Sequence, residues 1–225
     1  MTEPGLLSRV DHLVYGCRDL ELGIREIERL LGVRAAVGGR HPLWGTHNAL
    51  LALGARSYLE IIAPDPDQAP PTARRPFGLD SLKRSHLITW AANGTDLPTR
   101  RDEALRVGVP LGEVLSGSRR RADGLVLQWR LTDLHCVIAD GVIPFLIDWG
   151  TSVHPATAAP RGATLVELKA EHPEPERIRR MLEALALNLS VDAAPRPSLT
   201  ATIRGPNGIV VIDSRKNGVN SSGHT

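Results

Sequence analysis

The chain has 225 residues, of which 42% are hydrophobic, and this composition is sufficient for a large buried core. Its 27 basic and 25 acidic residues leave a formal net charge of +2. The densest basic cluster, Arg119–Arg121, precedes an Ala-Asp-Gly turn and is expected in a solvated loop. No nucleic-acid partner is therefore indicated. No apolar run approaches the ~20 residues that span a bilayer, so we expect a soluble protein without a membrane partner. The two cysteines form no disulfide framework, and a cytoplasmic location is therefore expected.

The first 66 residues follow a β-α-β-β-β pattern. A strand is predicted at 9–17 and an amphipathic helix at 20–31, which Asp19 caps at its start and Gly32 ends. Three more strands are predicted, at 33–37, 47–53 and 58–63, with a glycine-rich connection at 38–46.

A proline-rich linker, 67–84, separates this module from a second one at 85–150 with the same order. Its predicted elements are a strand at 85–92, a helix at 96–107 and strands at 112–118, 125–131 and 142–149. A third, partial βαββ module at 151–215 has a strand at 164–170, a helix at 173–185 and a hairpin of strands 199–204 and 208–213. Residues 216–225 are small and polar, and a flexible tail is expected there. The repeat predicts an α+β fold with curled, mostly antiparallel sheets.

One carboxylate, Glu60, lies inside the apolar strand at 58–63. Strand alternation places Tyr58, Glu60 and Ile62 on one face. An unpaired carboxylate is costly to desolvate. Either that face opens to water, or it lines a cavity in which Glu60 meets a cation, a proton donor or a substrate.

The motifs VDHLVYG, GTHNALLALG and YLEIIAPDP in the first module, RADGLVLQWRLTD and VIPFLIDWG in the second, and HPEP in the third cover nearly the whole chain. In this order they resemble the glyoxalase-like branch of the vicinal oxygen chelate superfamily. The resemblance implies paired β-α-β-β-β modules whose sheets curl into half-open barrels around a pocket. In such proteins the pocket often holds a divalent metal.

Carried over residue by residue, the resemblance implies metal ligands at His12, Glu60 and His86. The acid of the second module would fall near Leu146, where no ligand exists, and Asp148 is a displaced substitute at best. Imidazole and carboxylate ligands suit Zn, Ni, Fe or Mn.

Further pocket candidates lie around the glycine-rich connection and on the strands of the second module. His47 is a candidate catalytic residue alongside Glu60, and the candidate substrate-binding residues are His41, Trp44, Asn48, Trp90, Trp129, Arg130 and Trp149. Strand alternation does not allow Trp129 and Arg130 to face the same pocket.

Two functions follow from these observations. The first is a metal-assisted enzyme with isomerase, lyase or dioxygenase-type chemistry on a small oxygen-containing substrate. The second is a non-catalytic protein that binds or sequesters a small molecule in a tryptophan-lined cavity. The third module leaves open whether its helix covers a sheet edge or forms the contact of a homodimer.

Overall fold

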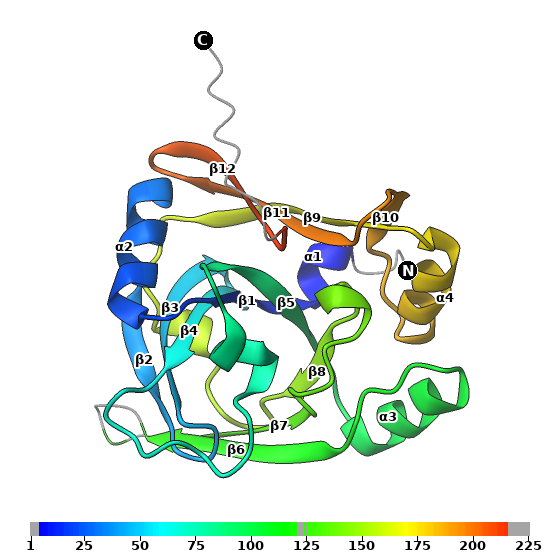
Figure 1. The fold of residues 1–225 in the computed structure, drawn as a ribbon, viewed down its shortest axis with the longest axis horizontal. Coiled ribbons are helices and arrows are strands. Elements are labelled where there is room, and N and C mark those ends of the chain that lie inside the picture. The colour runs from blue at the N-terminus through cyan, green and yellow to red at the C-terminus, as the bar shows by residue number, and fades with distance from the viewer. Residues whose placement is uncertain (1–4, 121–123, 125, 216–225) are drawn as a thin grey trace.

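A computed structural model describes residues 5–120, 124 and 126–215. Its main sheet has eight strands in the order β2-β3-β4-β1-β5-β8-β7-β6 and curls around a central space (Figure 1). The strands are β1 (Val10–Gly16), β2 (Ala36–His41), β3 (Thr46–Gly54), β4 (Ser57–Pro64), β5 (His86–Asn93), β6 (Val114–Arg120), β7 (Val126–Thr132) and β8 (Phe145–Asp148). Three short 3-10 helices, η1 (Pro76–Ser81), η2 (Ala139–Gly141) and η3 (Pro155–Thr157), lie in the connections.

The sheet consists of two β-α-β-β-β halves that meet at β1 and β5. These two strands pair antiparallel, whereas β4 joins β1 and β8 joins β5 in parallel. The remaining pairs of this sheet are antiparallel. The expected α+β class with curled, mostly antiparallel sheets is therefore confirmed.

The helix of the first half, α2 (Leu20–Leu31), has the ends that its sequence predicts. The Asp19 side chain accepts a hydrogen bond from the Leu22 N–H at 2.8 Å, and Gly32 ends the helix with a left-handed φ of 75°. The equivalent helix of the second half is α3 (Leu97–Arg106).

The strand β2 begins three residues later than predicted and runs through the glycine pair of the expected connection. A Cβ on Gly38 would lie 2.3 Å from Asn48 Oδ1 and 2.7 Å from Arg119 Nη1. The glycines thus give the strand a surface against which polar side chains from neighbouring strands can lie.

The third module forms a separate sheet in the order β10-β9-β11-β12. Its elements are β9 (Thr164–His172), α4 (Pro175–Ala184), β10 (Ser190–Ala193), β11 (Ser198–Gly205) and β12 (Gly208–Asp213), of which β10 was not predicted. A short helix, α1 (Leu6–Arg9), precedes β1. The tail expected at 216–225 lies outside the described residues.

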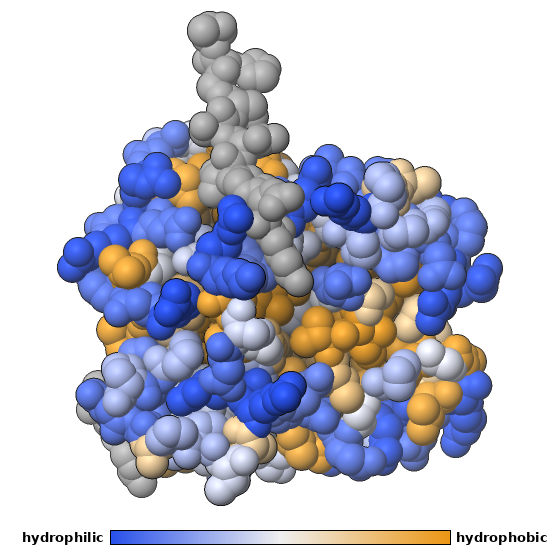
Figure 2. Space-filling model, viewed as in Figure 1, coloured by the Kyte–Doolittle hydropathy of each residue, from blue (hydrophilic) through white to orange (hydrophobic). Residues whose placement is uncertain are grey.

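The main sheet has a hydrophobic core on each face. Leu13 and Leu59 face the first core, which the sheet shares with α2, α4 and the third-module sheet. Val14 and Tyr58, one residue away on the same strands, face the second core on the concave side. Hydrophilic side chains cover much of the molecule, with a hydrophobic band across the middle of one face (Figure 2). Within the described ranges, no helix is both long and apolar enough to cross a membrane.

Candidate active site

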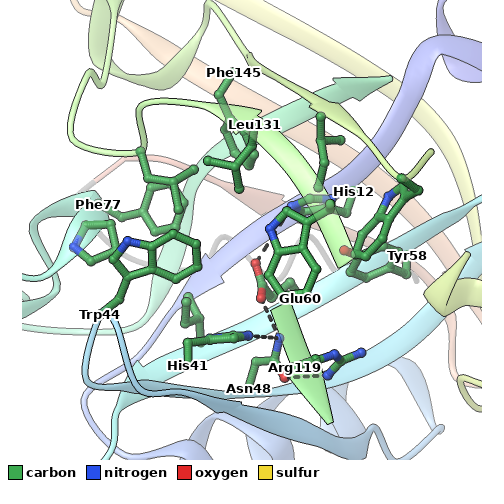
Figure 3. Close-up of a pocket in the computed structure, with 16 residues that line it drawn as sticks. His12, His41, Trp44, Asn48, Tyr58, Glu60, Phe77, Arg119, Leu131 and Phe145 are labelled. Atoms are coloured by element: carbon green, nitrogen blue, oxygen red, sulfur yellow. Dashed lines mark hydrogen bonds and ion pairs between the residues drawn. The ribbon is translucent and has the colours of Figure 1, made fainter. Parts of the chain in front are cut away.

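The concave side of the main sheet lines a small cavity of about 40 Å³ (Figure 3). Its polar lining side chains are His12, His41, Asn48, Glu60 and Arg119. Its aromatic lining side chains are Trp44, Tyr58, Phe77, Trp129, Phe145 and Trp149. All but Arg119 of the polar groups come from the first half of the sheet, and Phe77 comes from the linker between the halves.

An irregularity in β1 brings two consecutive side chains together. The pairing of β1 with β5 shifts between Val10 and His12, which leaves Asp11 as an extra residue. As a result, His12 Nδ1 lies 2.8 Å from Asp11 Oδ1. In a regular strand the two side chains would point to opposite faces, so the sequence pattern does not predict a contact between Asp11 and His12.

Asp11 is only 1% exposed and accepts hydrogen bonds from three rings. Trp149 Nε1 donates to Oδ2 at 3.1 Å, and His154 Nε2 lies 3.2 Å from the same oxygen. His154 Nδ1 accepts the Ala156 N–H, so Nε2 carries the His154 proton and donates it. Burial alone would raise the pKa of Asp11, but the hydrogen bonds from His12 and His154 lower it to about 2. Asp11 is therefore an ionised carboxylate.

This carboxylate determines how the His12 ring presents itself to the cavity. Because Nδ1 donates to Asp11, Nε2 is the atom that gains or loses a proton, and it lies 3.8 Å from Glu60 Oε2. The ring is stacked on Tyr58, with centroids 4.6 Å apart, and Phe145 meets it edge-on at 5.4 Å. Asp11, Tyr58 and Phe145 thus contact the imidazole, and its Nε2 faces Glu60.

Glu60 belongs to a hydrogen-bonded chain along the cavity wall (Figure 3). Asn48 Nδ2 donates to Glu60 Oε1 at 2.5 Å, and Arg119 Nη1 donates to Asn48 Oδ1 at 3.3 Å. The other oxygen of Glu60 is the one that faces His12. Arg119 is 8% exposed, so its expected place in a solvated loop is wrong. It belongs to β6 and lines the cavity.

His41 completes the polar wall as a neutral ring. Its Nδ1 lies 3.1 Å from Thr46 Oγ1, and its Nε2 lies 3.5 Å from Asn48 Nδ2. Burial lowers the pKa of His41 to about 4. The ring is therefore an uncharged hydrogen-bonding group at neutral pH.

This neutral histidine predicts a loss of stability in mild acid. Below pH 6.5 an unfolded histidine binds a proton that folded His41 binds only near pH 4, so acidification favours unfolding by about 3 kcal/mol across this window. Urea titrations between pH 7 and pH 4 should show this loss in the wild type and a smaller one in His41→Gln. The exposed His135→Gln serves as the control, and parallel profiles for the wild type and His41→Gln would contradict the prediction.

The structure does not bring His86 to the site. It pairs with Gly16, four residues along β1 from His12, and its Nδ1 lies 3.1 Å from the carbonyl oxygen of residue 84. The residue directly across from His12 on β5 is Ala91, which in turn pairs with Phe145 on β8. The second half of the sheet therefore places apolar groups where a matching pair of ligands would be.

Other predicted site residues also lie outside the cavity. His47 is half-buried on the face of β3 that points away from it, and Trp90 is fully buried in the other core. Arg130 is exposed, whereas Trp129 lines the cavity, as strand alternation requires. Asp148 accepts a hydrogen bond from the backbone N–H of residue 150.

The donor set does not fit the metal site implied by the resemblance. Of the three implied ligands, the structure brings His12 and Glu60 together and leaves His86 apart, whereas a catalytic zinc usually has three protein ligands. Among the residues that the structure describes, no group of three or more His, Cys, Asp or Glu side chains could hold a metal ion. The groups present instead form an ordered set of proton donors and acceptors.

Comparison with known proteins finds a matching family model and several similar structures. A family model described as glyoxalase-like domain matches residues 10–186. A hypothetical protein from Staphylococcus aureus has a similar structure, with a TM-score of 0.58 and 12% identity over 90% of this chain and 84% of its own. Methylmalonyl-CoA epimerase from Streptomyces coelicolor gives a TM-score of 0.43 and 21% identity over 65% of this chain and 98% of the epimerase. Methylmalonyl-CoA epimerase from Mycobacterium tuberculosis gives a TM-score of 0.43 and 20% identity over 67% of this chain and 93% of the epimerase. None of the curated proteins compared with the chain matches it.

Proposed function

Because the chain belongs to the glyoxalase-like domain family of the vicinal oxygen chelate superfamily, we propose that it is an enzyme that transfers a proton on a small oxygen-containing substrate. The reaction class is that of an isomerase or lyase. The observation that supports this proposal best is the Asp11–His12 pair, which directs one imidazole nitrogen at Glu60 inside an aromatic cavity. A nucleophile is not needed for this chemistry, because the reacting group is a proton.

His12 is proposed as the general base. Its Nε2 takes a proton from a carbon next to a carbonyl group, and the ionised Asp11 stabilises the resulting imidazolium. Glu60 Oε2 lies 3.8 Å from this nitrogen, where it can receive the proton from His12 or return it. The positive charge of Arg119, which lines the same cavity, favours the negative charge that develops on the carbonyl oxygen.

Metal-assisted chemistry is the weaker form of this proposal. Proteins of this superfamily commonly bind divalent metals. Here, however, the positions across from His12 are Ala91 and Phe145, which supply no ligand. No step of the proposed reaction depends on a metal.

Binding without chemistry is the second candidate. It is favoured by the six aromatic side chains of the cavity, which suit a flat, apolar ligand. This function would require the cavity to be occupied without any change in the ligand. The two candidates therefore predict different results in one experiment.

Proton transfer can be detected by screening several classes of carbonyl compound at once. The protein would be incubated in D₂O with a panel of 2-hydroxy ketones, 2-hydroxy aldehydes and 2-oxo acids, and the C–H signals next to the carbonyl followed by proton NMR. We expect enzyme-dependent exchange of at least one compound, unchanged by EDTA and retained in His47→Gln, whose ring lies outside the cavity. Saturable quenching of tryptophan fluorescence by these compounds without any exchange would assign the cavity to binding alone.

A further inference from the structure

A second cavity lies beside the first and shares one wall with it. Its volume is about 350 Å³, and Ile147 and Trp149 line both cavities. Three arginines from separate parts of the chain line the second cavity. Arg9 comes from the end of α1, Arg56 from the turn between β3 and β4, and Arg100 from α3. We call this cavity the arginine pocket.

The three guanidinium groups have few partners of their own. Arg9 donates to the carbonyl oxygens of residues 186 and 93, both at 3.3 Å, and Arg100 Nε donates to the carbonyl oxygen of residue 95 at 3.1 Å. Within the part of the chain that the structure describes, none of the three forms an ion pair with a carboxylate. Each guanidinium has five N–H donors, so most of them are available to a ligand.

The two carboxylates of the pocket offset only part of this positive charge. Asp11 is occupied by His12, Trp149 and His154, and Asp148 accepts a backbone N–H. Three positive and two negative side chains leave the lining with an excess of one positive charge. Burial and the neighbouring Arg100 both lower the pKa of Arg9, as expected of like charges gathered in a partly buried place.

We propose that the arginine pocket binds a phosphate group. Guanidinium groups match phosphate oxygens with paired N–H donors, and three converging arginines offer more donors than the two oxygens of a carboxylate can accept. A phosphate brings three oxygens and nearly two negative charges at neutral pH. The phosphate is either a free anion or part of a small molecule whose remainder contacts the wall at Trp149. This proposal does not rest on the proposed reaction.

Calorimetric titration of the full chain tests the proposal with two probes, inorganic phosphate and phenyl phosphate. We expect saturable binding of both that weakens as salt is added. Affinity should fall about tenfold or more in Arg56→Gln and in Arg100→Gln, since each removes one charged partner of the phosphate. Arg204→Gln, which changes an exposed arginine of β11 outside both cavities, should bind as the wild type does.

The outcomes separate the two sources of the phosphate and can overturn the proposal. Tighter binding of phenyl phosphate supports a phosphate-bearing small molecule, whereas equal affinities support a free anion. Absence of saturable binding to the wild type would overturn the proposal, as would affinities unchanged in both Arg56→Gln and Arg100→Gln. Because Arg56 is exposed in a turn, its substitution leaves the packing of the core intact, and circular dichroism verifies this.

Discussion

Replacing His12 by glutamine is expected to lower kcat for proton exchange by ~10²–10⁴-fold, the usual contribution of general acid–base catalysis. Glutamine keeps a polar group of similar length but cannot take up a proton at the position of Nε2. The exchange rate of whichever compound the NMR panel identifies gives kcat and KM directly. We expect Glu60→Gln to lower kcat as well, because the amide cannot carry a proton. The hydrogen bond from Asn48 is retained in this variant, since the amide oxygen of glutamine can accept it.

The matched control for His12→Gln is His47→Gln, which makes the same change on the face of β3 that points away from the cavity. A rise in KM with kcat unchanged in His12→Gln would contradict a proton-transfer role and would leave His12 as a binding residue.

Replacing Asp11 by alanine is expected to lower the free energy of unfolding by about 3–5 kcal/mol, because three buried N–H donors lose their charged acceptor and each lost bond costs about 1–3 kcal/mol. The carboxylate is 1% exposed, and its loss leaves the N–H groups of His12, Trp149 and His154 without their acceptor. Urea unfolding at pH 7 measures the change. The exposed Asp192→Ala is the control and should change stability by less than about 1 kcal/mol.

Acid titration separates the contribution that the charge of Asp11 makes to stability from the contribution of its packing. With a folded pKa of about 2 against 3.8 for the unfolded residue, Asp11 stabilises the fold fully above pH 3.8, and this contribution is lost as the pH falls towards 2. The loss amounts to about 2 kcal/mol. Asp11→Asn should be less stable than the wild type at pH 5, with the difference narrowing below pH 3. A constant difference across this range would show that the charge is not what stabilises the fold.

The elements and their order could be predicted because local rules act on short segments. Hydrophobic periodicity and the Asp19 and Gly32 signals give α2, and the repeat gives the two halves of the sheet. The resemblance placed His12 and Glu60 on neighbouring strands, and the structure brings them to 3.8 Å. The roles of these two residues in a reaction are proposals.

The rest of the site depends on departures from regular geometry. Strand alternation cannot predict that a bulge brings Asp11 to His12, since the extra residue leaves no mark in the hydrophobic pattern. Arg119 is the first residue of a basic run, and nothing local distinguishes it from a solvated arginine. Only the facing glycines of β2, which leave room for its side chain, show why it is buried.

The cavity is built asymmetrically from two similar halves, and this division affects how such a protein can change over time. The groups proposed to move the proton, His12 and Glu60, come from the first half, whereas the second half supplies mainly apolar walls such as Phe145. Mutations in the second half can therefore alter the shape of the accepted molecule while the chemistry stays intact. A module without proton-transferring groups of its own is therefore the part in which new substrate preferences can arise.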